Sequence, residues 1–581
     1  MMRVPTPATR REHADSREPA LMTALDLHRH AVLLRQSAQY AEAERSLLRA
    51  IELAHDFAAA HFELGLTYRD TGQLEDAADY LQLAVHFGPE LVVAWFELGA
   101  VLAKLARVDA AQAAYREVLA RDARHGTAWL NLGNLLKAGD DLGGAIECYR
   151  SAVACEPALA DAHCRLGYAL YKAGCYGEAR PCFDAALALS PDMVEAQHNL
   201  GLLLLETGHA AQALQRFERA LAINPDLVES RACVAHALRD LGRLDEALVQ
   251  YDAVLARHPE FADAVVNRSY ALLMQEAYAA GWAAYERRFA SGAIEPRGFP
   301  YMPWQGGGLA GKRVLVYAEQ GLGDEIMFAS CMPDLLQTGA QCVIECNTRL
   351  AAIFRRSFPQ AHVHGAAKND DKAWVEKLPP IDFQIAIGTL PYYFRRARAD
   401  FPTRPGYLAA DEQRSRFWRK ALAAGSSVRV GIAWRGGTPR SRQFTRSTAL
   451  PQWLPMLRLP GVAFHALQYG DVARELAELR DQGVTVAQLG DAVHDLDELA
   501  AIISSLDLVV SIDNTVAHLA GALGKTVWTL LPSSPEWRYQ RRGAAMPWYP
   551  SMRLFRCAAG EGWEPVIHRV TMELAGIAKP K

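Results

Sequence analysis

The sequence predicts a chain of two unlike halves: an all-helical repeat array, then an α/β region built from two parallel-sheet domains. The array is predicted by small residues, large apolar residues and prolines that each recur at a spacing of 34 positions. A fixed period of this kind is typical of stacked repeats. The α/β half is predicted by short β-rich runs that alternate with helical patterns after residue 311. Continuous apolar strands between helices indicate parallel sheets covered on both faces.

Each repeat has a small residue at a fixed anchor position. Glycine occupies it at Gly65, Gly99, Gly133, Gly167 and Gly201. Sixteen positions after the anchor stands a large apolar residue, and in most units proline follows eight positions later. Small residues let two paired helices approach closely, proline ends the second helix, and the pairs must stack to bury their apolar faces. This pattern resembles the tetratricopeptide repeat over about residues 24–290, in eight registers, which implies a superhelix with a concave groove.

A polar column precedes the anchors by two positions and carries Asn131, Asn199 and Asn267. In tetratricopeptide repeats this column tends to face the groove, and its asparagines resemble the peptide-binding ladder of the O-linked N-acetylglucosamine transferases. An Asn side chain both donates and accepts, so it can hold an extended peptide backbone without reading its sequence. We therefore expect these three residues to line an acceptor groove. The alternative is a solvated polar column, and charged residues in other registers interrupt the ladder.

Composition excludes several classes of protein. Lys plus Arg number 62 and Asp plus Glu 66, a net charge of −4, which argues against a bulk nucleic-acid binder. No apolar run approaches the roughly 20 residues of a membrane span, and the polar N-terminus lacks the apolar core of a secretory signal. The ten cysteines form no C-x-x-C pair, which indicates small buried hydrophobes in a reducing compartment. We expect a cytoplasmic protein without a metal or cofactor.

The first chemical motif is the turn Gly321-Leu322-Gly323-Asp324, which follows a β-rich run at 313–318. Glycines let a backbone approach a ligand closely. A dinucleotide fingerprint needs a third glycine, which is missing here, so NAD binding is the weaker interpretation. Asp324 can point into a cleft as a general base, or it can cap its own helix. The sequence leaves these two roles open.

Two further motifs lie in the second α/β domain. A buried strand ends at Asp513-Asn514-Thr515, and a helix carrying His518 follows. Backbone N–H groups at such a helix start can hold a diphosphate, and these side chains can add donors. The alternative is a helix cap with a core histidine. Arginines at 435 and 446 follow an earlier strand and suit bidentate phosphate recognition, unless they form a solvated basic loop.

Together these motifs resemble the heptosyltransferase-like glycosyltransferases of GT-B architecture. In that family the aspartate of the Gly-rich turn is the proposed catalytic base, which corresponds to Asp324. Gly321 and Gly323 belong to the same turn, and we expect them to bind the donor. The family's donor-binding segment corresponds to the stretch from Asp513 to Gly524, although Asn514 and Thr515 replace the usual residues. Arg435 or Arg446 corresponds to its phosphate-contacting basic residue.

The resemblance implies an inverting, metal-independent glycosyltransferase. Asp324 takes the acceptor proton, and Asp513, Asn514, Thr515, His518 and the arginines hold a nucleotide-sugar. The repeats recruit the acceptor, which we expect to be a protein or peptide, while a lipid or saccharide acceptor and self-association stay open. The alternatives are a non-catalytic repeat scaffold with a degenerate transferase region and a nicotinamide-dependent enzyme.

The expected organisation has seven parts, and its fold class is a tetratricopeptide superhelix followed by GT-B type double Rossmann-like domains. The parts are a disordered leader (1–23), the repeats (24–290), a Gly- and Pro-rich linker (291–311), a first Rossmann-like domain on the acceptor side (312–405), a connector (406–427), a second Rossmann-like domain on the nucleotide-sugar side (428–545) and a C-terminal segment packing back on the transferase (546–581). Strands are expected at 313–318, 342–346, 383–387, 429–434, 462–468, 506–512 and 526–531.

Overall fold

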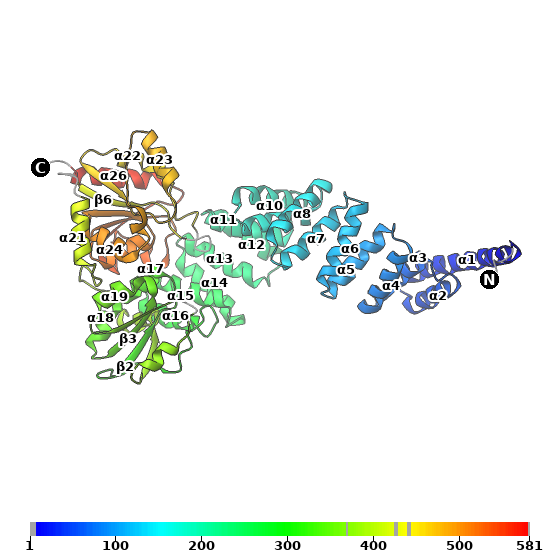
Figure 1. Ribbon diagram of the computed structural model, residues 1–581, viewed down its shortest axis with the longest axis horizontal. Helices are drawn as coiled ribbons and strands as arrows, with labels where there is room; N and C mark the ends of the chain where they lie inside the picture. The colour runs from blue at the N-terminus through cyan, green and yellow to red at the C-terminus, as the bar shows by residue number, and fades with distance from the viewer. Residues whose placement is uncertain (1–6, 368–369, 423–427, 438–442, 579–581) are drawn as a thin grey trace, which may run out of the picture. The chain divides into compact units, whose positions relative to one another are not determined.

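The computed structural model describes residues 7–367, 370–422, 428–437 and 443–578. The chain forms two compact units, Met1–Leu200 and Gly201–Lys581. The first is entirely helical where described, and the second adds two sheet-containing lobes to the last repeats (Figure 1). The ends of the expected leader, connector and C-terminal segment, at 1–6, 423–427 and 579–581, lie outside the described residues.

Helix pairs build the first unit, and each odd-numbered helix packs against the next even-numbered one. The helices are α1 (Pro7–Gln36), α2 (Tyr40–Leu53), α3 (Ala58–Asp70), α4 (Leu74–Phe87), α5 (Val92–Lys104), α6 (Val108–Arg121), α7 (Gly126–Ala138), α8 (Leu142–Cys155), α9 (Ala160–Lys172) and α10 (Tyr176–Leu189); α11 (Val194–Glu206) crosses into the second unit. Because α1 begins at Pro7, the expected disordered leader at 1–23 is wrong for its described part. Proline is well tolerated at a helix start, and the segment is rich in Ala, Arg and Glu, which favour helix.

The glycine anchors work as the sequence predicts. A Cβ at Gly133 would lie 2.7 Å from the Tyr149 ring, and one at Gly99 would lie 2.9 Å from the Tyr115 ring. Carbon atoms do not approach so closely, so only glycine lets these aromatic rings pack against the partner helix. The anchor and the large apolar residue sixteen positions later are therefore contacting partners across each helix pair.

A second 34-residue column occupies the turn inside each pair. Its backbone has positive φ in eight registers, with glycine in four of them and other residues at Ala38, Ala106, Asp140 and Glu276, where φ is 56–62°. Left-handed backbone costs a residue with a Cβ roughly 1–2 kcal/mol, whereas glycine adopts it freely. These four turns therefore carry backbone strain that the glycine-containing turns avoid.

We expect Ala106→Gly to raise the stability of the repeats by about 0.5–1 kcal/mol, because relief of left-handed strain exceeds the added entropy of the unfolded chain. Ala103→Gly, three residues earlier inside α5, should lower it by about 1 kcal/mol. Urea unfolding followed by circular dichroism measures both. If both variants lose the same stability, the Ala106 turn carries no backbone strain.

The second unit begins with α12 (Ala210–Ile223), α13 (Val228–Asp240), α14 (Leu244–Arg257), α15 (Ala262–Met274) and α16 (Tyr278–Tyr285). The first lobe (residues 299–408) has a parallel five-stranded sheet in the order β1-β5-β2-β3-β4, formed by β1 (Met302–Pro303), β2 (Arg313–Tyr317), β3 (Gln341–Asn347), β4 (His362–Ala366) and β5 (Phe383–Ala386). Its helices are α17 (Leu322–Phe328), α18 (Met332–Gln337), α19 (Ala351–Ser357) and α20 (Leu390–Phe394).

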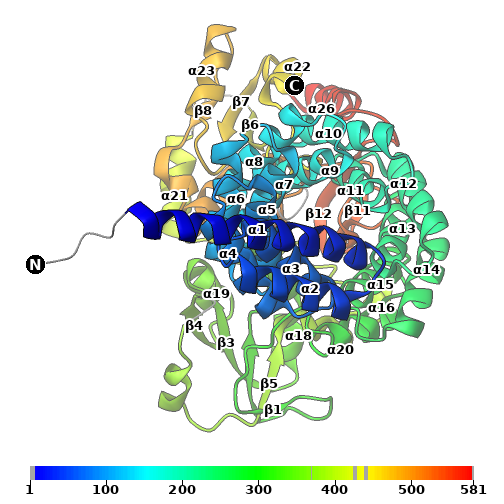
Figure 2. The ribbon, with the colours of Figure 1, turned by 90° about the vertical axis from the view of Figure 1, so that its right-hand side faces the viewer.

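The second lobe (residues 428–578) has a seven-stranded sheet in the order β11-β12-β10-β9-β6-β7-β8, parallel except for the β11–β12 pair. Its strands are β6 (Val428–Ala433), β7 (Val462–Ala466), β8 (Ala487–Gln488), β9 (Leu508–Ile512), β10 (Val527–Leu531), β11 (Ala545–Met546) and β12 (Tyr549–Arg556). Its helices are α22 (Leu454–Leu457), α23 (Ala473–Asp481), α24 (Leu496–Ser505), α25 (Thr515–Ala522) and α26 (Glu564–Ile577), and α21 (Glu412–Ala421) joins the lobes. Figure 2 shows the two sheets from a second side.

All seven expected strands form, but the expected boundaries need two corrections. The second sheet extends past residue 545, because β12 pairs with β10, and α26 buries Val566 and Leu574 in the core of that lobe. The linker at 291–311 is also structured in part: β1 pairs with β5, and Trp304 is buried. Apolar residues among the glycines and prolines are covered by the first lobe, which sequence composition alone does not reveal.

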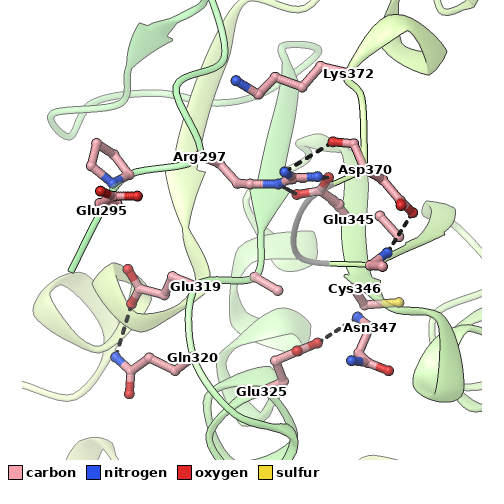
Figure 3. Close-up of a pocket in the computed structure, with 14 residues that line it drawn as sticks. Glu295, Arg297, Glu319, Gln320, Glu325, Glu345, Cys346, Asn347, Asp370 and Lys372 are labelled. Atoms are coloured by element: carbon pink, nitrogen blue, oxygen red, sulfur yellow. Dashed lines mark hydrogen bonds and ion pairs between the residues drawn. The ribbon is translucent and has the colours of Figure 1, made fainter. Parts of the chain in front are cut away.

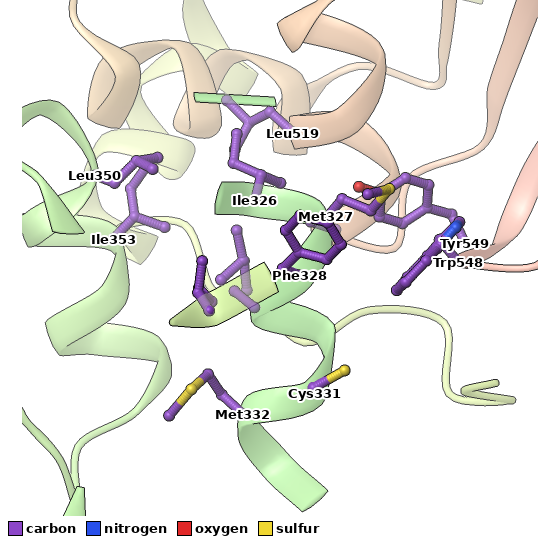
Figure 4. Packing of buried hydrophobic residues seen from close by; sticks show 14 of the residues in the cluster. Ile326, Met327, Phe328, Cys331, Met332, Leu350, Ile353, Leu519, Trp548 and Tyr549 are labelled. Atoms are coloured by element: carbon purple, nitrogen blue, oxygen red, sulfur yellow. The ribbon is translucent and has the colours of Figure 1, made fainter. Parts of the chain in front are cut away.

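The last repeat shares one hydrophobic core with both lobes. Trp282 of α16 is 1% exposed and stands edge-on to Trp537 and Trp548 of the second lobe and to Phe328 of the first, with ring centroids 5.6–6.3 Å apart. Its Nε1 donates to the Arg395 carbonyl over 3.0 Å. Figure 4 shows the part of this core around α17, where Phe328 and Met327 lie near Trp548.

A buried ion pair adds to this junction. The Arg288 side chain, directly after α16, is fully buried and donates to Glu319 Oε1 over 3.0 Å and to Thr389 Oγ1 over 2.9 Å. The Glu319 side chain is fully buried as well. Arg288 also pairs with Glu286 over 2.8 Å, whereas Arg288 is the cation paired with Glu319 among the described residues. Burying the Glu319 charge without that cation is strongly unfavourable.

We expect Arg288→Met to destabilise the second unit by roughly 3–5 kcal/mol, because Glu319 is left buried without its cation. The double variant Arg288→Met/Glu319→Gln should recover most of that loss. Differential scanning calorimetry of the full chain compares the two. A double variant no more stable than the single one would show that packing around Arg288, and not the pair, matters.

The ten cysteines are all free thiols. Seven are buried, Cys155 and Cys182 are half-buried, and Cys175 alone is exposed. Burial raises the pKa of Cys164 to about 12. The cysteines thus behave as small apolar residues, as the sequence predicts. Among the described helices, none combines the length and the apolarity that crossing a membrane requires.

Candidate functional site

The two lobes meet where α17 of the first packs against α25 of the second. Gly323 of α17 faces His518 of α25 so closely that a Cβ would lie 3.2 Å from the imidazole ring. Ile326 and Leu519, one from each helix, lie near each other in the shared core (Figure 4). The two turns that the sequence analysis singles out are therefore neighbours across the lobe boundary.

Asp324 reaches across this boundary. The N-cap of α17 is Gly321, and no side chain caps the helix, so the capping role left open for Asp324 is not adopted. Its Oδ1 instead accepts a hydrogen bond from Arg538 Nη2 of the second lobe over 2.6 Å. The Asp324 side chain is 20% exposed and that of Arg538 is 13% exposed. Asp324 is thus a half-buried carboxylate that points at the other lobe.

Asp513 lies deep in the second lobe, where it is 1% exposed. The Tyr539 hydroxyl donates to its Oδ1 over 2.7 Å, and Arg446 Nη2 lies 3.0 Å from its Oδ2. Arg446 also pairs with Glu536 over 3.2 Å. We call Asp324, Arg446, Asp513, Glu536, Arg538 and Tyr539 the interlobe cluster. It combines three carboxylates with two guanidinium groups.

The cluster shifts the pKa of its cations. Burial alone lowers the pKa of Arg538, but Asp324, Glu536 and Asp513 outweigh it, and the net pKa is raised. The same balance, with Asp513 as the main anion, raises the pKa of Arg446. Both guanidinium groups therefore stay charged at any physiological pH. The two permanent positive charges are thus paired with three carboxylates in the cluster.

His518 is buried, with 2% of its surface exposed. Its Nδ1 lies 2.9 Å from the Tyr549 hydroxyl, and its Nε2 lies 3.3 Å from the Tyr539 hydroxyl. Burial, together with Arg538 and Arg446, holds the pKa of His518 well below its usual value, so the ring is neutral. The ring therefore supports Tyr539 and packs on Gly323, and both of its nitrogens lie next to tyrosine hydroxyls.

Asn514 and Thr515 start α25. The Asn514 Oδ1 accepts from the backbone N–H of Ala517 over 3.2 Å, which makes Asn514 the helix cap, and Thr515 is the first helical residue and half-buried. Asn514 Nδ2 also donates to the Arg435 carbonyl over 3.2 Å. A Cβ at Gly436 would lie 2.5 Å from the Asp513 carbonyl oxygen, so only glycine lets these loops approach.

The two candidate phosphate-binding arginines differ in place. Arg446 belongs to the interlobe cluster, whereas the Arg435 side chain turns toward α23, where Nη2 donates to the Asp471 carbonyl over 3.0 Å and lies 3.3 Å from Glu475. Arg446 is therefore the arginine that joins Asp513. Gly321, which is exposed, and Gly323 form the turn that leads into Asp324.

The sequence analysis did not assign Arg538, Tyr539 or Glu536 to the site. They lie in and next to the short helix η10 (Trp537–Tyr539), which follows β10. The sequence offered one signal for these residues: a charged residue between two aromatic ones, Trp-Arg-Tyr, follows a predicted strand. The last repeat contacts the same helix: Tyr270 of α15 stacks on Trp537 at 5.5 Å and 7°. The repeats thus end against the site.

The three groove asparagines are placed individually. Asn131 is half-buried and donates to the Tyr115 hydroxyl over 3.2 Å, and Asn199 is only 4% exposed and lies against Cys164. Asn267 donates to Asp263 Oδ1 over 2.8 Å and accepts from Arg239. Each amide therefore has a partner inside the protein, and Asn199 is too deeply buried to meet a peptide as it stands.

A second feature is a cavity of about 440 Å³ in the first lobe, at the carboxyl ends of β2, β3 and β4 (Figure 3). Its wall is rich in carboxylates, including Glu319, Glu325 and Glu345. Arg297 Nη2 pairs with Glu345 over 2.6 Å. The wall also contains the cations Arg297 and Lys372, so it combines acidic and basic groups. Sequence reasoning missed this cavity because β4 was not predicted.

Glu325 is the unusual group of this cavity. It follows Asp324 on α17 but points the other way, where its Oε2 accepts from the Asn347 backbone N–H over 2.9 Å (Figure 3). Among the described residues it has no ion-pair partner. Burial raises the pKa of Glu325 to about 7, from a usual 4.5. The folded protein therefore keeps this proton to near-neutral pH, while the unfolded chain loses it near pH 4.5.

Comparisons with known proteins define the repeat half. Residues 28–91, 92–125, 158–226 and 235–294 match tetratricopeptide repeat families, and residues 133–174 match a family described as TPR repeat. The N-terminal half of the chain, to about residue 300, is therefore made of tetratricopeptide repeats. The chain is also similar to Protein FlbA of Caulobacter vibrioides, with 34% identity over 318 residues, which is 51% of this chain and 52% of that protein. The chain thus spans about half the length of this curated relative.

Several solved structures resemble part of the chain. YrrB, described as a TPR protein with an unusual peptide-binding site, is 21% identical over 33% of this chain and 97% of its own, with a TM-score of 0.30. MamA is 20% identical over 29% of this chain and 92% of its own, with a TM-score of 0.27. PilF of Pseudomonas aeruginosa is 16% identical over 37% of this chain and 96% of its own, with a TM-score of 0.33.

Among the described residues, no group of three or more His, Cys, Asp and Glu side chains is arranged to hold a metal ion.

We expect Glu325→Gln to stabilise the chain more at pH 8 than at pH 5. The raised pKa means that stability falls as pH rises from about 4.5 to about 7, by roughly 3 kcal/mol, and glutamine removes this penalty. Thermal melting at both pH values measures the difference, with Glu295→Gln at the exposed rim as control. If Glu325→Gln raises the stability equally at both pH values, the Glu325 carboxyl does not have the raised pKa.

Proposed function

We propose that this chain is an inverting, metal-independent glycosyltransferase of GT-B type. It transfers a sugar from a nucleotide-sugar donor to a protein or peptide acceptor that its tetratricopeptide repeats recruit. The observation that carries the proposal is the interlobe cluster, in which a carboxylate of the first lobe, Asp324, meets arginines of the second. An acid-base group and a cationic diphosphate site are what such a transfer needs in one place.

In this mechanism Asp324 is the general base. It takes the proton of an acceptor hydroxyl while the hydroxyl oxygen attacks the anomeric carbon of the donor. A carbon–oxygen bond forms on one face of the sugar, the bond to the diphosphate breaks on the other, and the configuration inverts. The nucleoside diphosphate leaves with the bonding electron pair.

The charge that develops on the leaving diphosphate must be stabilised by groups already in place. Arg446 and Arg538 supply two permanent positive charges, and the start of α25 adds backbone N–H donors and the positive end of its dipole. Arg446 is itself oriented by Asp513 and Glu536. Tyr539, braced by His518, holds Asp513 in turn.

The repeats supply the recognition of the acceptor. Tetratricopeptide repeats suggest protein or peptide binding, and the last repeat contacts η10 through Tyr270 and Trp537. An acceptor held near α15 therefore lies close to the interlobe cluster. The acid-lined cavity beside Glu325 lies on the first lobe, the side that we assign to the acceptor.

One observation favours a second candidate, a non-catalytic repeat scaffold. Both aspartates of the cluster are already paired with arginines, so the site is electrostatically satisfied without a ligand. A degenerate transferase that keeps these pairs only for stability would look the same.

We expect the wild-type chain to release nucleoside diphosphate from one donor of a nucleotide-sugar panel, and Asp324→Asn to lower that rate about 10²–10⁴-fold, because the base is lost. Chromatography of the products measures release, and Asp481→Asn, at an exposed position of the second lobe, is the matched control. A wild-type rate no higher than that of Asp324→Asn with every donor, in the presence of a repeat-bound protein acceptor, would favour the scaffold.

A further inference from the structure

We propose that Arg538 is the residue that receives the donor diphosphate, and that Asp324 holds it until the donor arrives. Arg538 is then a shared partner of two anions, the catalytic carboxylate and the diphosphate. Donor binding and release of Asp324 become one event, so the donor must bind before the acceptor can be deprotonated. This inference rests on the proposed function and assigns to it a residue that the sequence motifs do not contain.

The ion pair between Asp324 and Arg538 uses only part of the hydrogen-bonding capacity of the guanidinium group. It consists of one close contact, Nη2 to Oδ1 at 2.6 Å, and not of the two parallel bonds that a guanidinium can form with a carboxylate. Arg538 Nε is buried and has no hydrogen-bond partner among the described residues. The guanidinium thus keeps unused donor capacity, which the two oxygens of a phosphate match geometrically.

The second arginine of the cluster is held differently. Arg446 lies 3.0 Å from Asp513 and 3.2 Å from Glu536, both in its own lobe, and Asp513 is also fixed by Tyr539. The carboxylate side chain of Asp513 is 1% exposed, compared with 20% for Asp324. The two arginine side chains are almost equally exposed, at 13% and 11%, so the difference lies in the carboxylates. The pair across the lobes has the more exposed carboxylate and fewer partners, and we expect an anion to disrupt that pair.

Charge balance gives the direction of the change. Asp324, Asp513 and Glu536 carry three negative charges against two positive ones on Arg446 and Arg538. A diphosphate adds negative charge, so it must compete with a carboxylate already present, and it repels Asp324. The backbone at 538 stays in place because Trp537 is stacked on Tyr270. Only the side chain has to turn, from Asp324 toward the diphosphate.

Because Asp324 and the diphosphate compete for Arg538, removing the Asp324 charge is predicted to tighten diphosphate binding. Asp324→Asn keeps the shape of the side chain but removes the competing charge, so it should tighten binding of a nucleoside diphosphate about tenfold, or roughly 1.4 kcal/mol. Arg538→Gln should weaken binding about tenfold, and Arg538→Lys should restore part of the loss. In an Arg538→Gln background, Asp324→Asn should change the affinity less than twofold, because no arginine is left to release.

Isothermal titration calorimetry with UDP, GDP, ADP and CDP tests these affinities on the full chain, with melting temperatures to confirm that each variant is folded. Unchanged or weaker binding by Asp324→Asn would overturn the proposal. Equal tightening with and without Arg538 would also overturn it, because the gain would then be a general charge effect. If the affinities follow the predicted pattern but no sugar is transferred, the shared role of Arg538 is supported and the proposed transferase activity is refuted. Absence of binding by every variant would refute both.

Discussion

The architecture of the second unit depends on one aromatic junction, where Trp282 of the last repeat is enclosed by Trp537, Trp548 and Phe328 from the two lobes. Large aromatic side chains contribute much apolar area at fixed edge-to-face geometry. One indole from the last repeat thus contacts both lobes, in addition to the direct packing of α17 on α25. The last repeat is therefore a structural part of the second unit, in which it shares one hydrophobic core with the lobes.

The junction also explains why charged groups can be buried beside it. Arg288 lies over the ring of Tyr285, which is 5.7 Å from Trp282, and Arg538 of the interlobe cluster lies over the ring of Trp537. A low-dielectric surround strengthens each ion pair and makes each unpaired charge costly. The charges at this junction are therefore stable only as pairs.

The sequence predicts repeats and strands well because each rests on a local pattern. The 34-residue columns pair Gly133 with Tyr149 as expected, and the apolar runs at 429–434 and 506–512 both form buried strands. Asp324 and Asp513 could be selected because each follows a strand at a glycine-rich or polar turn. The cluster around them could not be predicted, because its other members join it by tertiary contact. Arg538 lies 214 residues from its partner, and only folding brings the two together.

Local signals also leave out how deeply a residue is buried. Asn199 has the residue type and repeat position of a peptide-binding residue. Its burial depends on the neighbouring helix pair, which the sequence pattern alone does not show. His518 matches a donor-binding pattern, yet two tyrosines from distant segments take both of its nitrogens. The linker at 291–311 contains turn-forming residues, but Trp304 is drawn into the first lobe. In each case burial by distant parts of the chain overrides the local preference.

The distribution of the cysteines has a practical consequence. Thiol-directed reagents attack the accessible thiolate, and nine of the ten thiols are wholly or partly covered. Cys175, in the turn before α10, is the natural attachment point for a single fluorophore or spin label on the repeats. The unmutated chain can thus carry a spectroscopic reporter of acceptor capture, without the cysteine-free background that such work commonly demands.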